Sequence, residues 1–202
     1  MPLSMSAIRN TFRILKNGRV SMVLTAMLSS GVLMPIEGVA APQGGSVVAG
    51  SATINQSGTT TNINQASNKA VINWNSFGVA KNEVVNFNQP SVSSVTLNRV
   101  VGNSQSAIDG MLKANGQVFL VNPNGVLISK SGSINTAGFL ATTKSISDND
   151  FMNGNYKFTA NDKSQSSGVV NMGTINISDS GYAVLAGNNV SNLGTISAIK
   201  GK

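Results

Sequence analysis

Carboxylates are the side chains of this chain best suited to catalysis, because histidine and cysteine are both absent from its 202 residues. Without them the chain has no imidazole general base, no Ser-His triad, no disulfide and no zinc site of the usual kinds. Cleavage of polysaccharides by carboxylates needs several acids clustered with a basic residue. The acids after residue 40 are instead widely spread in sequence: Glu83, Asp109, Asp148, Asp150, Asp162 and Asp179. We therefore expect no enzymatic activity and no cofactor.

Two smaller groups of residues suggest ligand sites. Asp148-Asn149-Asp150 places two carboxylates one residue apart, enough for one corner of a calcium site but not for a full shell of oxygens. A solvated loop is the favoured interpretation. Trp74 and Phe77 flank Asn75-Ser76, where an exposed aromatic ring can stack on a sugar. Burial in the first coil is favoured, because aromatic rings bury large areas.

The net charge gives little support for nucleic-acid binding. The whole chain has 14 basic and 7 acidic residues, a net charge of +7. Four of the basic residues precede residue 20, and from Ala41 onward the balance is 10 basic minus 6 acidic residues, or +4. These ten are scattered lysines and one arginine, which do not gather into a phosphate-binding patch. We expect no nucleic-acid partner.

The first 40 residues have the pattern of an export signal. Residues 1–19 carry four positive charges and no negative charge, and residues 20–34 are uncharged. As a helix this uncharged run reaches roughly 22 Å, short of a hydrocarbon core of about 30 Å. The small residues Gly38-Val39-Ala40 follow, so we predict a signal peptide over residues 1–40 that is cleaved near Ala40. The chain is expected to be exported and to keep no stable membrane span.

After residue 41 the sequence predicts short strands separated by turns. Period-two alternation and short β-branched runs recur, bounded by Asn-Gly pairs and single glycines. Residues 104–113 are an exception, because Ile108 and Leu112 lie four apart and predict one or two helical turns. In residues 151–158, Asn153-Gly154 predicts a hairpin on the side of the fold. The predicted strands are residues 59–64, 70–74, 84–87, 95–100, 117–121, 126–129, 156–160, 169–172, 174–177, 182–185 and 194–197.

A repeat of about 20 residues predicts how these strands are arranged. Residues 171–175 (NMGTI) recur 21 residues later as residues 192–196 (NLGTI). A weaker copy, residues 132–135, lies 41 residues before residues 173–176, about two such periods. Each unit is expected to form one coil of a parallel β-solenoid, in which stacking places Ile on Ile and Asn on Asn. An antiparallel β-sandwich is the alternative.

Five segments between residues 70 and 143 share their order and spacing with a known family. They are residues 72–77 (INWNSF), 85–90 (VNFNQP), 97–100 (LNRV), 115–125 (NGQVFLVNPNG) and 134–139 (INTAGF). Together they resemble the N-terminal secretion domain of the filamentous haemagglutinin family, the exported partners of two-partner secretion systems. No Asn-Pro-Asn-Leu motif precedes them, which suggests the branch that resembles high-molecular-weight adhesins.

The resemblance implies an all-β fold, a right-handed parallel β-helix with coils of about 20 residues. A short N-terminal cap and the side hairpin are expected to complete it. Residues 41–202 are expected to form the secretion domain, truncated at its C-terminal end, because the last repeat runs to the end of the sequence without a cap. The chain is therefore expected to be the beginning of a longer protein.

The resemblance also implies partners and a location. An outer-membrane pore-forming translocator with periplasmic binding domains is expected to recognise the domain and to pass the chain to the cell surface. The whole protein is then expected to be a secreted adhesin, with a host glycan or cell-surface receptor as a further partner. The alternative is a freestanding carbohydrate-binding or surface structural module that needs no translocator.

Asn122-Pro123-Asn124-Gly125 is the first candidate for translocator recognition or for a structural turn. Pro123 fixes its own φ at about −65°, Gly125 tolerates positive φ, and the Asn122 side chain can bond backbone amides further on. A primarily structural role is favoured. Gln89-Pro90 and Asn98-Arg99 are the second candidates, and Arg99, the only arginine after residue 40, either pairs across coils or faces the translocator.

Overall fold

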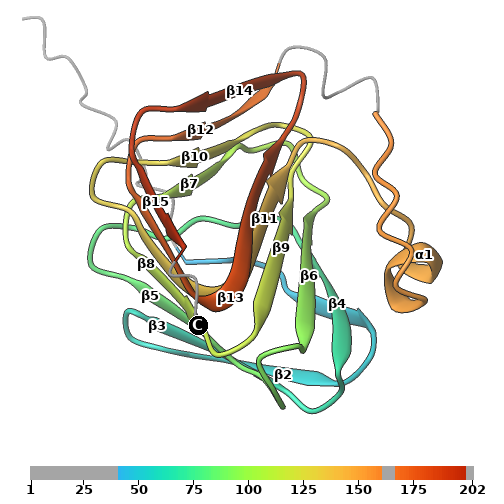
Figure 1. Ribbon diagram of the computed structural model, residues 1–202. Coiled ribbons are helices and arrows are strands. Elements are labelled where there is room, and N and C mark those ends of the chain that lie inside the picture. Colours follow the sequence, from blue (N-terminus) through green and yellow to red (C-terminus); the bar gives the residue numbers. More distant parts are fainter. Residues whose placement is uncertain (1–40, 161–166, 199–202) are drawn as a thin grey trace, which may run out of the picture. The chain divides into compact units, whose positions relative to one another are not determined.

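The computed structural model describes residues 41–160 and 167–198, which form a parallel β-solenoid of about six turns (Figure 1). Each full coil has three sides: two belong to an 11-stranded sheet and the third to a 4-stranded sheet. Strands of successive coils pair in parallel, as the repeat predicted. The alternative β-sandwich is therefore wrong. The predicted signal peptide, residues 1–40, lies outside the described residues.

The strands follow one another around the three sides. The first side has β3 (Thr60–Gln65), β5 (Val84–Asn88), β8 (Met111–Ala114), the starts of β11 (Ser133–Thr142) and β13 (Thr174–Ala186), and β15 (Thr195–Ala198). The second side has β4 (Lys69–Trp74), β6 (Val95–Val100), β9 (Gln117–Val121) and the ends of β11 and β13. The third side has β7 (Ser106–Ile108), β10 (Val126–Ile128), β12 (Gly168–Asn171) and β14 (Asn189–Asn192). An N-terminal cap of β1 (Ser46–Ala49) and β2 (Ala52–Ser57) pairs antiparallel with β4 and β3.

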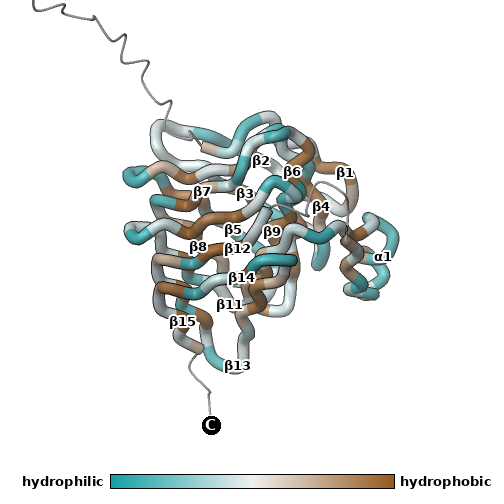
Figure 2. The backbone as a smooth tube through the Cα atoms, turned by 90° about the horizontal axis from the view of Figure 1, so that it is seen from above, coloured by the Kyte–Doolittle hydropathy of each residue, from teal (hydrophilic) through white to brown (hydrophobic). Residues whose placement is uncertain are grey.

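The inside of the solenoid is filled by apolar side chains that recur coil by coil. Figure 2 shows the hydrophobic segments at matching positions of successive coils. Trp74 and Phe77 are both buried, with ring centroids 5.6 Å apart in an edge-on arrangement. They belong to the core rather than to an exposed sugar-stacking site.

Stacked residues follow the register that the repeat predicted. Asn171 pairs with Asn192 and Thr174 with Thr195, and the Asn171 Nδ2 donates to the Asn192 Oδ1 at 2.8 Å. Further asparagine pairs on the first side stack in the same way: Asn86 on Asn62 at 3.1 Å, Asn88 on Asn64 at 2.8 Å, and Asn176 on Asn135 at 2.9 Å. Each such bond ties one coil to the next.

The helical turns predicted for residues 104–113 are wrong. This segment forms β7 and β8, which meet at a corner between two sides of the solenoid. Ile108 and Leu112 are both fully buried because each points inward from its own strand. At the corner, a Cβ on Gly110 would lie 2.1 Å from the Ala80 carbonyl oxygen, so only glycine fits. The four-residue spacing of Ile108 and Leu112 therefore comes from two strands that meet at a corner, and not from a helix.

The hairpin predicted for residues 151–158 is also wrong, as is the strand at residues 156–160. The segment contains a short helix, α1 (Asp148–Met152), whose N-cap Ser147 accepts a hydrogen bond from the Asp150 N–H at 3.0 Å. Asn153 is the C-cap and Gly154 follows with φ of 78°, so the Asn-Gly pair ends a helix instead of turning a hairpin. We refer to described residues 143–160 as the side excursion.

The side excursion changes the meaning of the 41-residue repeat. Residues 133–136 of β11 pair directly with residues 174–177 of β13, so the two copies lie in adjacent coils and not two periods apart. The extra residues leave the solenoid after β11 and return at β12. The place of the interruption was predicted correctly, although its structure was not.

Candidate functional site

The Asn-Pro-Asn-Gly corner joins β9 to β10, where the second side of the coil meets the third. Asn122 is fully buried, and its Nδ2 donates to the Ser104 carbonyl at 3.0 Å and to the Ser106 hydroxyl at 2.9 Å. Its Oδ1 accepts hydrogen bonds from the backbone N–H of Asn124 at 2.9 Å and from the Asn124 Nδ2 at 3.0 Å. All four polar positions of the Asn122 amide are therefore used inside the protein.

The rest of the motif ties this corner to neighbouring segments. The Asn124 Nδ2 donates to the Gly102 carbonyl at 2.9 Å, and the Ser167 hydroxyl donates to the Pro123 carbonyl at 2.5 Å. Gly125 has φ of 106°, which L side chains rarely adopt. Its carbonyl accepts from the Ser106 N–H at 3.0 Å. The motif is thus a turn held from the inside, and only Pro123 and Asn124 are partly exposed.

Gln89 holds a different corner, between β5 and β6. It is buried, its Nε2 donates to the Thr96 hydroxyl and to the Gln117 carbonyl, each at 3.0 Å, and its Oε1 accepts from the Gly116 N–H at 3.0 Å. The Thr96 hydroxyl in turn donates to Gln65 at 2.5 Å. A continuous polar chain therefore crosses three coils here. Pro90, the next residue, is exposed.

Asn98 and Arg99 point to opposite faces of β6, as neighbours in a strand must. Asn98 lies inside, fully buried, and accepts from the indole Nε1 of Trp74 at 3.0 Å. Arg99 lies outside, where its Nη1 donates to Asn73 of the preceding coil at 3.1 Å. Its Nη2 donates to the Ile146 carbonyl at 2.8 Å and pairs with the Asp148 carboxylate at 2.6 Å. Arg99 therefore pairs across coils and also fastens the side excursion.

The acids of Asp148-Asn149-Asp150 have partners within the chain. Asp148 pairs with Arg99, and the Asp150 carboxylate accepts from the Ser147 hydroxyl at 2.7 Å and from the Asn155 Nδ2 at 2.9 Å. Among the described residues no group of three potential metal ligands is present. The solvated loop that the sequence favoured is instead the first turn of α1.

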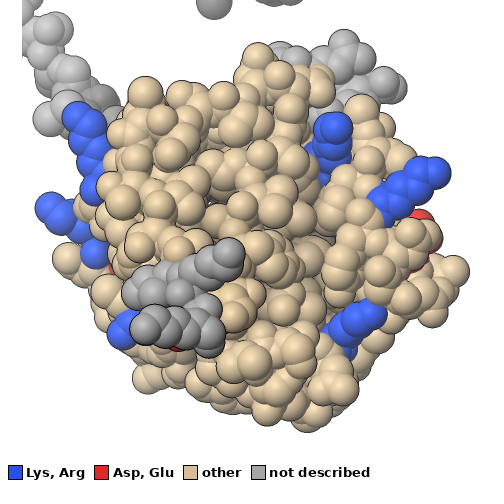
Figure 3. Space-filling view, viewed as in Figure 1, with Lys and Arg blue, Asp and Glu red and all other residues tan. Residues whose placement is uncertain are grey.

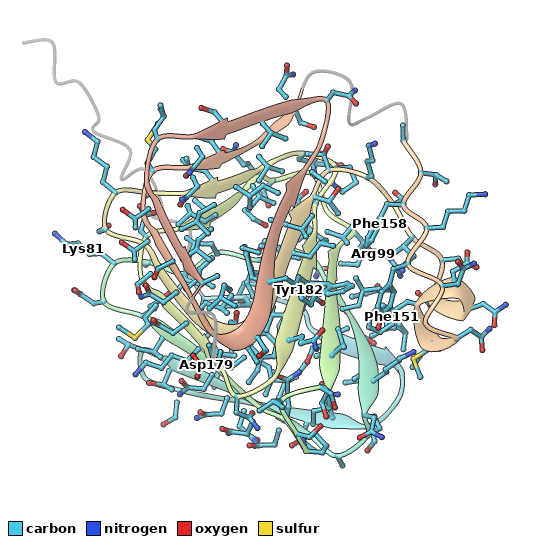
Figure 4. The ribbon with its side chains drawn as sticks, in the orientation of Figure 1. Lys81, Arg99, Phe151, Phe158, Asp179 and Tyr182 are labelled. Carbon is cyan, nitrogen blue, oxygen red and sulfur yellow. The ribbon has the colours of Figure 1, made fainter. Side chains whose placement is uncertain are left out.

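An aromatic cluster beneath the side excursion was missed by the sequence analysis. Phe119 of β9 has ring centroids at 5.9 Å from Phe151 and 5.1 Å from Tyr156, in edge-on contacts. Lys69 donates from its Nζ to the Met152 carbonyl at 2.9 Å and lies over the Tyr156 ring. Figure 4 shows Phe151 and Phe158 near Arg99 on this face. The available signal was the continuous apolar run of residues 118–121, which is typical of a strand covered on both faces.

Two tyrosines have raised pKa values: Tyr156 of the side excursion and Tyr182 of the second side. Burial raises the pKa of Tyr156. Burial also raises the pKa of Tyr182 to about 12, and the charge that Tyr156 would carry contributes in the same direction. The Tyr182 hydroxyl donates to the Gln117 Oε1 at 2.6 Å. Both phenols are therefore neutral hydrogen-bonding groups at physiological pH.

The predicted site residues do not form one cluster. The Asn122 corner joins the second and third sides, Gln89 joins the first and second, and Asn98-Arg99 lies within the second side. Most of these side chains bond within the chain, so their common feature is to hold corners and coils together. The face shown in Figure 3 carries only scattered charges, in agreement with the dispersed lysines of the sequence.

Comparison with known proteins places these features in a family. The model of the TPS secretion domain matches residues 38–201. The chain belongs to this family. As a TPS secretion domain, it carries the export-related part of proteins that are exported and secreted. The resemblance to the secretion domain of the haemagglutinin-type proteins is thereby confirmed.

The similar proteins come from Haemophilus influenzae. A heme/hemopexin-binding protein of strain Rd is 44% identical over 164 residues, covering 78% of this chain and 18% of that protein. A second heme/hemopexin-binding protein is 46% identical over 101 residues, covering 50% of this chain and 11% of that protein. The crystal structure of the HMW1 secretion domain matches with a TM-score of 0.75 and 40% identity, covering 78% of this chain and 42% of that one. The chain thus spans less than a fifth of the curated relatives.

Within residues 41–160 and 167–198, no helix has both the length and the apolar character needed to cross a membrane.

Proposed function

We propose that residues 41–202 are the part of an exported protein that an outer-membrane pore-forming translocator recognises. The observation that carries this proposal is the match of the TPS secretion domain to residues 38–201. Recognition is assigned to the periplasmic binding domains of the translocator. The predicted signal peptide, residues 1–40, supplies the preceding step across the inner membrane.

The folded coil supplies a driving force for export. Each coil that stacks on the last buries apolar side chains such as Ile134 and Ile175, which are fully buried. Burial contributes about 25 cal/mol for each Å² of apolar surface. A coil that folds outside the cell is too wide to slide back through a narrow pore, so stacking favours movement in one direction. A variant unable to stack its coils should therefore leave the cell more slowly.

The role of the domain is non-enzymatic. Three acids have partners within the chain. Asp148 fastens the side excursion, Asp150 accepts from the N-cap Ser147 of α1, and Glu83 accepts from the Ala80 N–H at 2.8 Å. For the whole protein we assign a surface adhesin-like role with a host glycan or receptor as the bound partner. The two curated relatives are named for heme/hemopexin binding, which is a property of those much longer proteins.

Export from cells with and without a matching translocator tests the proposal. The parent chain is compared with Asn122→Ala/Asn124→Ala, and the amount in the culture medium is measured. Asn153→Ala/Asn155→Ala is the matched control, because both side chains are exposed on the side excursion. Release that needs the pore supports the proposal, and release without any pore contradicts it.

A second variant separates recognition from folding at the corner. Pro123→Ala changes the partly exposed ring but leaves the four hydrogen bonds of the Asn122 amide in place. Lost release with normal β-structure in the periplasm assigns recognition to the exposed turn. If Pro123→Ala is released normally and only an unfolded Asn122→Ala/Asn124→Ala variant loses release, the motif has a structural role.

A further inference from the structure

An open groove runs along the corner where the first side of the solenoid meets the second. Two hollows of about 420 and 400 Å³ share Asn115 and Asn135 in their walls. A third, of about 220 Å³, shares Ala137 and Ser178 with the largest. Because neighbouring hollows share lining residues, they lie side by side as one shallow, open groove across several coils. We name it the amide groove, after the asparagines among its lining residues: Asn86, Asn88, Asn115, Asn135 and Asn176. Apolar surface, including that of Ile177 and of the exposed Val92, makes up much of the rest of the wall.

The amides of the groove are aligned by the register of the sheet. Asn86 pairs with Lys113, Lys113 with Asn135, and Asn135 with Asn176 in successive coils. An asparagine amide has two N–H donors and an oxygen with two lone pairs. Asn176 uses one donor, to Asn135 at 2.9 Å, and Asn86 uses one donor, to Asn62 at 3.1 Å. Asn135 donates to Ser133 at 3.1 Å, and Asn115 exchanges two hydrogen bonds with the Gln89 backbone, each at 2.7 Å. Each of these amides still has one N–H beyond the bond it donates, and Lys113 supplies the donors on the coil of β8.

The remaining lining is mostly neutral. Tyr182 closes one end, with its side chain 36% exposed and its hydroxyl held by Gln117. Asp179 and Lys113 carry single charges in separate hollows; Figure 4 labels Asp179 and Tyr182 on the bend of β13. Amides, hydroxyls and one phenol ring suit a ligand with many hydroxyl groups and an apolar ring face. They suit a highly charged ligand poorly.

The spacing of the coils distinguishes a sugar chain from a peptide. Neighbouring strands are about 4.8 Å apart, whereas side chains on one face of an extended peptide recur about every 6.8 Å. A peptide lying across the coils would lose register with the amides. A linear β-linked pyranose chain advances, for each ring, by a distance close to the spacing of neighbouring strands. Strand addition is also excluded here, because β5, β8 and β11 are each paired on both edges.

We propose that the amide groove binds a linear, neutral β-linked oligosaccharide, with one sugar ring for each coil. This role is separate from recognition by the translocator, since it needs no second protein. Sugars of the bacterium's own envelope and sugars of a host share this chemistry.

Nuclear magnetic resonance titration of the purified full chain tests the proposal. The probes are cellohexaose, a glucose chain, and chitohexaose, an N-acetylglucosamine chain. N-acetylglucosamine chains are the class found in cell envelopes. Maltohexaose, whose α-linkages coil the chain, is the comparator. The side-chain amide signals of Asn86, Asn135 and Asn176 should shift with at least one β-linked probe, and shift less with maltohexaose.

Variants give the controls. Asn176→Ala removes one exposed amide and should weaken binding about three- to tenfold, the range expected for one hydrogen bond. Ser178→Tyr places a ring in the groove from an exposed position and should abolish binding. Asn153→Ala, on the side excursion, should bind like the parent. Circular dichroism confirms that each variant is folded.

Three results would overturn the proposal. They are the absence of shifts at the groove amides with both β-linked probes, equal binding of maltohexaose, and binding of an extended serine-alanine hexapeptide in place of the sugars. These binding measurements do not depend on export, so this proposal and the translocator proposal are tested separately.

Discussion

Replacing Asn122 by alanine removes the group that holds the Asn-Pro-Asn-Gly corner from inside. The change deletes four hydrogen bonds, two donated by Nδ2 and two accepted by Oδ1. At a net value of roughly 0.5–1.5 kcal/mol each, their loss lowers the free energy of unfolding by about 2–6 kcal/mol. Domains of this size are typically stable by about 5–15 kcal/mol, so the variant should be severely weakened.

Urea unfolding followed by tryptophan fluorescence measures this loss. Trp74 is the only tryptophan of the chain and is 1% exposed, so its emission reports on the core. Asn55→Ala, at an exposed position of the N-terminal cap, is the matched control and should change stability by less than about 0.5 kcal/mol, as exposed substitutions usually do. A change in Asn122→Ala no larger than in this control would refute the assignment of the corner to Asn122.

The variant Asn122→Asp adds a pH test of the same site. The new carboxylate keeps the acceptor position towards Asn124 but faces the Ser104 carbonyl without a donor. Burial disfavours its ionised form, so its pKa rises in the folded state above the unfolded value of about 4. Stability should therefore fall as the pH rises through and above that unfolded value, and recover on acidification. Equal stability loss at pH 4 and pH 7 would contradict this reasoning.

Three further outcomes follow from other contacts. Arg99→Ala removes the ion pair with Asp148 and two hydrogen bonds, which should lower the free energy of unfolding by about 1–3 kcal/mol. Limited proteolysis should then cut the side excursion before it cuts the solenoid. Cleavage of both parts at the same rate would contradict this. Gly110→Ala places a Cβ against a backbone oxygen and should lower the urea midpoint by an amount corresponding to about 1–3 kcal/mol, whereas an unchanged midpoint would contradict the tight corner. Because the pKa of Tyr182 is raised to about 12, stability should fall between pH 10 and 12 as the unfolded phenol ionises first, and Tyr182→Phe should reduce that fall in a pH series of unfolding curves.

The repeat and the turn residues were enough to predict the solenoid. The strand at residues 117–121 coincides with β9, and the 21-residue offset matches the pairing of Asn171 with Asn192. These predictions succeeded because stacking in a solenoid places identical residues in identical environments, so each coil produces a similar short sequence.

Other elements could not be predicted from local patterns. β1 and β2 alternate between exposed and half-buried residues, since they cap the first coil and bury little. Neither strand of this cap was predicted, and β7, β8, β11 and β14 were missed as well. β7, β8 and β14 are at most four residues long, and β11 passes through a corner, pairing first with β8 and then with β9. The side excursion was misassigned because Asn-Gly suits both a hairpin and a helix end, and only contact with Phe119 and Arg99 selects the helix.

The turn at residues 122–125 was predicted, but its internal contacts were not. The four motif residues lie at the expected corner, yet the sequence did not reveal that Asn122 points inward to Ser104 and Ser106. The amide groove also escaped prediction, since it is formed by residues of β5, β8, β9, β11 and β13 and the loops between them, which only the register brings together.

The dependence of export on a translocator is the most direct test of the central claim. The full chain with its predicted signal peptide is expressed in cells with and without a matching outer-membrane pore protein, and the culture medium is assayed by immunoblot. Our interpretation predicts release only when the pore is present, with periplasmic accumulation in its absence. Equal release in both strains would contradict the role of this chain as a translocator-recognised secretion domain.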